Sequence, residues 1–263
     1  MSGITAHTLT LVLTFLMSHL AAFRPIPVIP EAQKIWIFGF ISALFAIFGR
    51  LIRGVTTGGA IAGAAVCFGL LYAAGLGGFA ALFTVFVLTW LATRVGYARK
   101  QRLGTAEARS GRDSLQVLAN LGTAAGCAAL YIHFPRGRFL VAMAAALAEA
   151  AADTVSSEIG QAMGGTPRLI TTWRKAIQGT NGAITLLGTS AGAVAALTVA
   201  FVFLVLGVAA LSSSAVIALS GFAGMIMDSF LGATVEGHAR LGNNAVNFLS
   251  TATAAILAFL IVT

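Results

Sequence analysis

The sequence RFLVAMAAALAEAAADTVSSE occupies residues 138–158 and decides the class of fold. It is apolar and long enough for a membrane-spanning helix, which needs about 20 residues. It nevertheless carries three acids, Glu149, Asp153 and Glu158. A charge in a membrane is costly, so each acid must be paired, bind a cation or face a wet cavity. The stretch therefore predicts a helix of a membrane protein with a functional site built into it.

The composition of the whole chain supports this class. Of its 263 residues, 58% are hydrophobic and only 9% are charged, and the mean hydropathy is +0.93. A soluble domain carries about 25% charged residues, so this chain has too little polar surface to coat a globule in water. We predict an all-α fold, a polytopic transmembrane helical bundle.

Apolar stretches of sufficient length predict about nine spans, with a range of seven to nine. They lie at 4–23, 34–52, 57–74, 77–95, 114–133, 138–158, 181–208, 213–232 and 244–262. We expect them to form a single integral-membrane domain over residues 1–263, with a motif-rich catalytic part at 112–247.

The basic residues predict the orientation of these spans. If the N-terminus is cytoplasmic and all nine segments cross, twelve of the sixteen Lys and Arg residues fall in cytoplasmic loops, where such residues are enriched. This predicts a bacterial-type inner (plasma) membrane protein with its C-terminus outside. No aromatic residues alternate with these charges as on a nucleic-acid-binding surface, so we expect no nucleic acid partner.

Three acids at the cytoplasmic ends of their spans are the predicted catalytic and metal-binding residues, Asp153, Glu158 and Asp228. Carboxylate oxygens are ligands that Mg²⁺ prefers, and Mg²⁺ often bridges to substrate phosphates. On a regular helix Glu158 lies about 140° around the axis from Asp153, so either the helix breaks or Glu158 serves another neighbour. The alternative is that these acids pair with basic residues and stabilise the helix ends.

A glycine turn, Gly179-Thr180-Asn181-Gly182, precedes the long apolar run at 181–208. Backbone N–H groups and the positive end of a helix dipole at such a turn suit an anion. Arg174 and Lys175, just upstream, add positive charge. The alternative is a simple turn and helix cap at the membrane surface.

Other polar residues fall at the same cytoplasmic ends, where they suit phosphate or nucleotide contacts; helix capping and interhelical hydrogen bonds are the alternative. The predicted nucleotide- and phosphate-binding residues are Arg112, Gln116, Asn120, Thr154, Ser157, Arg174, Lys175, Gly179, Thr180, Asn181, Gly182, Thr185, Ser229, Gly232, Thr234, Asn243, Asn244 and Asn247.

Four motifs carry a resemblance to a known family. They are Ala152-Asp153-Thr154 with Ser157-Glu158-Ile159-Gly160, the turn at 179–182, Asp228-Ser229-Phe230-Leu231-Gly232-Ala233-Thr234, and Val246-Asn247-Phe248. In this order they resemble an integral-membrane family that includes the plant phytyl-phosphate kinase of vitamin E synthesis and animal transmembrane protein 19. This chain has Ala183 where the plant turn often has a second glycine, which leaves the nucleotide preference open.

The resemblance implies Mg²⁺-dependent phosphoryl transfer from a nucleoside triphosphate, with CTP favoured. The acceptor it implies is a prenyl monophosphate such as phytyl or geranylgeranyl phosphate, and the product is the prenyl diphosphate. Two alternatives stay open. One is a transporter or flippase that moves a lipid phosphate or an ion by means of the intramembrane acids, and the other is a membrane enzyme that transfers a nucleotidyl or head group.

Overall fold

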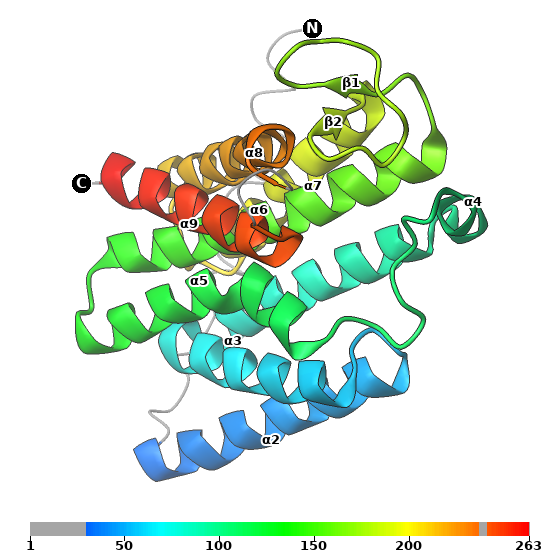
Figure 1. Ribbon diagram of the computed structural model, residues 1–263. Helices are drawn as coiled ribbons and strands as arrows, with labels where there is room; N and C mark the ends of the chain where they lie inside the picture. The colour runs from blue at the N-terminus through cyan, green and yellow to red at the C-terminus, as the bar shows by residue number, and fades with distance from the viewer. Residues whose placement is uncertain (1–29, 237–240, 263) are drawn as a thin grey trace, which may run out of the picture. The chain divides into compact units, whose positions relative to one another are not determined.

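A computed structural model describes residues 30–236 and 241–262, and the chain divides into two compact units, Met1–Ile37 and Phe38–Thr263. The span predicted at 4–23 lies outside the described residues. The elements in chain order are α2 (Glu31–Leu51), α3 (Thr57–Arg94), α4 (Tyr97–Leu103), α5 (Ser114–His133), α6 (Gly137–Met163), β1 (Arg168–Leu169), β2 (Ala183–Ile184), α7 (Leu186–Val205), α8 (Leu211–Thr234) and α9 (Asn243–Ile261) (Figure 1).

Seven of the described helices are long and apolar enough to cross a membrane, which lies within the predicted range of seven to nine. The longest, α3, has 38 residues and contains one non-helical residue, Gly75, with a φ of +58°. The helix folds back there, so that residues 59–63 and 82–89 line the same cavity. The spans predicted at 57–74 and 77–95 are the two segments of α3.

The second unit is built around α6, the helix that carries the deciding stretch. It packs against α3, α5, α7, α8 and α9 (Figure 1), and 78% of its apolar window is buried, against 39% or less for the other six helices. A helix that is hydrophobic all round belongs inside a bundle. Its many alanines let neighbouring helices approach closely, so α6 holds its acids at a fixed place among five other helices.

The segment between α6 and α7 departs from the all-helical pattern. β1 and β2 pair antiparallel there, with Arg168 opposite Ile184. The span predicted at 181–208 begins later, at Leu186, because Gly182 has a φ of +71° and the next two residues form β2. Thr185 caps α7, and its Oγ1 accepts a hydrogen bond from the N–H of Gly188 at 3.1 Å.

Successive helices of the second unit alternate in direction, so the described residues of four loop segments lie at one end of the bundle: 52–56, 95–113, 164–185, and 235–236 with 241–242. We call this the basic end, because the described part of these loops and the adjoining helix ends carry eleven Lys and Arg residues. The turn between α5 and α6, with Arg136 and Arg138, lies at the opposite end. The segregation of charge follows the sequence-based prediction.

Candidate active site

A cavity of about 280 Å³ lies at the basic end, enclosed by α5, α6, α8, α9 and the turn at 178–185; we call it the polar cavity. Its walls come from segments more than 100 residues apart in the sequence. The predicted site residues that line it are Arg112, Gln116, Asn120, Asp153, Thr154, Ser157, Glu158, Gly179, Thr180, Asn181, Gly182, Thr185, Asp228, Ser229, Gly232, Asn243 and Asn247.

Two carboxyl groups meet in this cavity. Asp153 of α6 and Asp228 of α8 both line it and interact electrostatically with each other, and the hydroxyl of Ser250 in α9 donates to Oδ1 of Asp228 at 3.2 Å. Glu149, one turn deeper in α6, interacts electrostatically with both aspartates, and its Oε1 is buried without a hydrogen-bonding partner. Like charges this close in an apolar bundle need a proton or a cation between them.

The donor set of Asp153 and Asp228 fits a magnesium ion. Mg²⁺ commonly takes one or two protein carboxylates and completes its shell with water and substrate phosphates. Within residues 30–236 and 241–262, no group of three or more His, Cys, Asp or Glu side chains is arranged to hold a metal. The protein would therefore supply two carboxylates, with the unpartnered oxygen of Glu149 beneath them.

Glu158, the third predicted metal ligand, has a different neighbour. It lines the polar cavity, but one carboxylate oxygen pairs with Lys100 of α4 and the other accepts from Thr93 Oγ1 at 3.1 Å. Lys100 is fully buried and also donates to the backbone oxygens of Ala92 and Thr93, at 3.1 and 2.8 Å. The pair anchors α4 to α6. Sequence reasoning missed Lys100, because nothing distinguishes it from the other cations of the same loop.

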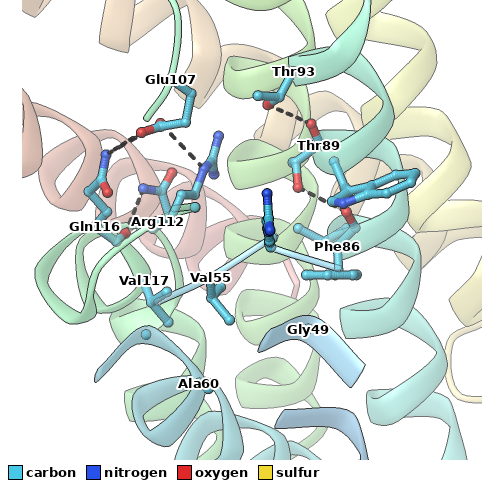
Figure 2. A pocket seen from close by; sticks show the side chains of 18 of the residues that line it. Gly49, Val55, Ala60, Phe86, Thr89, Thr93, Glu107, Arg112, Gln116 and Val117 are labelled. Carbon is cyan, nitrogen blue, oxygen red and sulfur yellow. Dashed lines mark hydrogen bonds and ion pairs between the residues drawn. The ribbon is translucent and has the colours of Figure 1, made fainter. Parts of the chain in front are cut away.

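Arg112 stands between α5 and α6. Its guanidinium donates to Thr154 Oγ1 at 3.3 Å and lies 3.9 Å from a carboxylate oxygen of Glu107. Gln116 donates to the same carboxylate, 3.3 Å from each oxygen (Figure 2). Sequence reasoning did not select Glu107; the available signal was one of two acids in a loop rich in arginine, the other being the helix-capping Asp113.

A second cavity adjoins the polar one, and we call it the apolar cavity. It has a volume of about 330 Å³ and is lined mainly by apolar side chains of α2, α3 and α5, among them Phe45 and Val85. Figure 2 shows Ala60, Phe86 and Val117 on its walls. Four residues line both cavities: Glu107, Arg112, Gln116 and Asn120. A polar and an apolar compartment therefore share one wall.

The asparagines of the site divide into two groups. Asn120 of α5 and Asn247 of α9 are buried, and Asn247 donates to the side-chain oxygen of Asn120 at 3.4 Å. This contact is an interhelical hydrogen bond at the floor of the polar cavity. Asn243, at the start of α9, and Asn181 of the glycine turn line the cavity and are exposed, so these are the asparagines that a ligand can reach.

Four residues of the predicted set do not line the polar cavity: Arg174, Lys175, Thr234 and Asn244. Arg174 and Lys175 are exposed in the loop between the two strands, where the backbone of Arg174 bonds to Leu169. Thr234 Oγ1 instead bonds to the backbone oxygen of Phe230 at 2.7 Å. The pairing of β1 with β2 and the rotation of α8 about its axis direct these side chains away from the cavity. Neither feature could be predicted from the sequence.

Glu236 lines the polar cavity just beyond the end of α8, and sequence reasoning did not select it. Partial burial raises the pKa of the Glu236 carboxyl above its ordinary value. The group also interacts electrostatically with Asp153 and Asp228. It adds an acidic group to a cavity that Arg112 also lines.

The glycine turn fits tightly against the helix ends around it. Gln178 donates to the backbone oxygen of Gly160 at 2.6 Å, which ties the turn to α6. A Cβ atom added to Gly182 would lie 2.5 Å from both the backbone nitrogen of Ala233 and the backbone oxygen of Ser229. The turn can approach α8 this closely only because residue 182 has no side chain.

We therefore expect Gly182→Ala to lower both the thermal stability and the ligand affinity of the polar cavity. A left-handed backbone costs an L-residue about 1–2 kcal/mol, and the clash with α8 adds to that cost. Gly104→Ala is the matched control, because Gly104 has a similar φ of +73° and open space around the added Cβ. Thermal unfolding in detergent measures both variants, and equal losses of stability would show that the contact with α8 contributes nothing.

Comparison with known proteins places the chain among integral membrane proteins. The family model described as integral membrane protein DUF92 matches residues 40–255. Protein VTE6, chloroplastic, of Arabidopsis thaliana is 33% identical over 195 residues, which are 71% of this chain and 59% of that protein. The chain thus spans about three fifths of the length of that relative.

Two further relatives cover more of their own length. An uncharacterized membrane protein of Methanocaldococcus jannaschii is 32% identical over 231 residues, which are 87% of this chain and 94% of the relative. Protein PGR of Arabidopsis thaliana is 30% identical over 222 residues, which are 74% of this chain and 77% of the relative. No solved structure matches this chain.

Proposed function

The chain belongs to the DUF92 family of integral membrane proteins, and from this premise we propose that it is a prenyl-phosphate kinase. In this reaction a prenyl monophosphate accepts the terminal phosphoryl group of a nucleoside triphosphate, with CTP favoured, and becomes the prenyl diphosphate. The observation that carries the proposal is the polar cavity itself. Its facing carboxylates, Asp153 and Asp228, and its cation, Arg112, adjoin an apolar cavity at the basic end.

The residues of the polar cavity supply what phosphoryl transfer requires, which is positioning and neutralisation of charge. Asp153 and Asp228 would hold Mg²⁺, which when bound offsets the negative charge of the triphosphate. Arg112, which donates a hydrogen bond to Thr154 beside Asp153, can hold a phosphate oxygen. The turn at 179–182 lines the same cavity and would offer backbone N–H groups to the remaining phosphate oxygens, apart from that of Thr180, which already donates to the backbone oxygen of Ile177 at 3.1 Å.

The acceptor needs little activation by the protein. A prenyl monophosphate already carries an anionic oxygen that can attack the terminal phosphorus of the nucleotide. A new P–O bond forms to that oxygen, the bond to the bridging oxygen breaks, and the nucleoside diphosphate leaves with the electron pair. A strong general base is therefore unnecessary, and no residue of the cavity is assigned that role.

We place the basic end at the cytoplasmic face, where nucleotide is available. The excess of Lys and Arg at this end supports that orientation, and it fits a bacterial-type inner (plasma) membrane. The lipid chain of the acceptor would then remain within the bilayer or the bundle, while its phosphate reaches the polar cavity from the membrane side.

The test is a transfer assay with the purified protein in nanodiscs. We expect that radiolabel from the terminal phosphate of CTP appears in geranylgeranyl diphosphate, and that EDTA abolishes the transfer while added Mg²⁺ restores it. Thr253→Val is the control variant, because Thr253 bonds only to the backbone oxygen of Leu249 and lines neither the polar nor the apolar cavity. Transport of the lipid phosphate across the membrane without consumption of nucleotide would instead support the transporter alternative and refute the kinase.

A further inference from the structure

The apolar cavity has an interior suited to hydrocarbon. The side chains around it include Phe45, Leu82, Val85, Phe86 and Leu121. The buried hydroxyl of Thr89, which also faces it, is already bonded to the backbone oxygen of Phe86 at 3.1 Å. An interior with no unsatisfied polar group favours apolar occupants over ordered water.

Small residues create the space. Gly49, Gly59, Ala60 and Gly63 line the cavity where α2 and the first segment of α3 face Phe86. At roughly 30 Å³ per water-sized group, 330 Å³ holds on the order of ten such groups. That is room for part of one hydrocarbon chain.

The rim of the apolar cavity is cationic. Arg53, Arg94, Arg109 and Arg112 all line it at the basic end. Arg94 lies 3.7 Å from the centre of the Trp90 ring and donates to the backbone oxygen of Ile52 at 2.9 Å, so its guanidinium is held in place. Arginine at the mouth of an apolar pocket suits an amphiphile with an anionic head group.

The wall shared by the two cavities consists of side chains. Glu107, Arg112 and Gln116 form it through the contacts seen in Figure 2. The hydroxyl of Tyr97 donates to the backbone oxygen of Glu107 at 3.1 Å, which holds the loop over the wall. A head group at Arg112 therefore touches the polar cavity while its chain extends into the apolar one.

We propose that the apolar cavity binds the hydrocarbon chain of a single-chain isoprenoid phosphate, with the phosphate against Arg112. This inference rests on the proposed function, because it names the place where the lipid acceptor of that reaction binds. It makes the glycines of α3 the residues that set how much of the chain can enter.

Gly63 allows the cavity to be filled without disturbing the helix. It lines the apolar cavity, and a Cβ atom added there meets no heavy atom within 4 Å. Gly69 lies in the same segment of α3 and also has open space around an added Cβ, but it lines neither the apolar nor the polar cavity. Gly63→Phe and Gly69→Phe are therefore a matched pair that differs in whether the new ring occupies the cavity.

The experiment uses geranylgeranyl phosphate with a diazirine at the end of its chain, in nanodiscs of phosphatidylcholine and phosphatidylglycerol. In the wild type we expect photolabelling of residues 57–63 and 82–90. We expect Gly63→Phe to reduce this labelling by about ten-fold, since losing the burial of two methylenes costs about that factor, and Gly69→Phe to leave it unchanged. Labelling that is insensitive to Gly63→Phe, or that lies on lipid-facing residues outside the cavity, would overturn the proposal.

Turnover separates this inference from the proposed function. In Gly63→Phe the KM for geranylgeranyl phosphate should rise by about ten-fold, while Gly69→Phe, outside both cavities, should leave that KM unchanged. If the expected labelling occurs but no acceptor is phosphorylated, the proposed function is refuted, and the binding of the hydrocarbon chain in the apolar cavity is supported. If phosphoryl transfer occurs without labelling of the cavity, binding in the apolar cavity is refuted, and the proposed function is supported.

Discussion

Asp228→Asn is expected to lower phosphoryl transfer by a factor of 10² or more while leaving the protein folded. Removing a group that stabilises charge in the transition state typically costs about 10²–10³ in rate. Asparagine keeps the shape of the side chain and can still accept from Ser250, but it removes one of the two facing charges. The rate of transfer in nanodiscs at saturating Mg²⁺ is the measurement, and the same loss is expected for Asp153→Asn.

The same variants should not lose thermal stability when Mg²⁺ is absent. Without Mg²⁺ the carboxyl groups of Asp153 and Asp228 must take up a proton, because two like charges in an apolar surrounding repel. Asparagine at one position removes that requirement, so the melting temperature should equal or exceed that of the wild type. Mg²⁺ with nucleotide should raise the melting temperature of the wild type more than that of either variant, because a ligand stabilises the state that binds it.

The prediction is specific because the transfer rate should fall while the melting temperature without Mg²⁺ should not. A merely structural pair of aspartates would lose stability and activity together, and it would show no difference in its response to Mg²⁺. Thr253→Val, purified and assayed in the same way, is the control. Full activity in Asp228→Asn would refute a catalytic role for Asp228.

Lys100→Met is expected to destabilise the protein by about 3–5 kcal/mol, the usual cost of removing one partner from a buried ion pair. Lys100 is fully buried, and Glu158 has an exposed fraction of only 8%. The single change leaves the carboxylate of Glu158 buried with only Thr93 as a hydrogen-bonding partner. Thermal unfolding in detergent, followed by size-exclusion chromatography, measures the loss.

The control is the same substitution at an exposed ion pair. Lys34→Met removes the contact between Lys34 and Glu31, which lie 2.6 Å apart at the start of α2. Exposed pairs of this kind contribute at most about 1 kcal/mol, so this variant should unfold close to the wild type. A similar loss of stability in both variants would contradict the structural role of the Lys100–Glu158 pair.

The double variant Lys100→Met/Glu158→Gln decides the role of Glu158. Neutral partners leave no buried charge, so we expect much of the stability to return. If Glu158 serves chiefly to anchor α4 to α6, activity should return as well. A double variant that is folded but inactive would instead support the assignment of Glu158 as a metal ligand, which the sequence motif suggested.

How far the sequence predicts the site differs between its parts. Asp153 and Asp228 could be found because an acid in an apolar span is conspicuous in any sequence, and their shared position at one end followed from the alternation of spans. Arg174 and Lys175 were selected because they adjoin the glycine turn. Strand pairing between 168–169 and 183–184 turns that loop outward, and two-residue strands leave almost no pattern in a sequence.

The apolar cavity could not be predicted at all. It exists because α3 folds back at Gly75 and brings the small residues around Gly63 opposite Phe86. In the sequence the same glycines indicate only that helices can pack closely there. Whether such a surface closes against its neighbour or leaves a space depends on how side chains from three helices fit together.

By itself the sequence determined the class of the protein, the approximate positions of its spans in the described residues and the accumulation of Lys and Arg at one end, and it singled out the two aspartates that line the polar cavity. Each of these follows from how one segment partitions between lipid and water, and that property is local. Only the tertiary structure decided that Glu158 pairs with Lys100, that Glu107 stands between two cavities and that an apolar space adjoins the polar one. These contacts depend on which helix faces meet. An apolar helix can be rotated about its own axis to many angles and remain equally compatible with the lipid, so the sequence of each span does not fix the contacts.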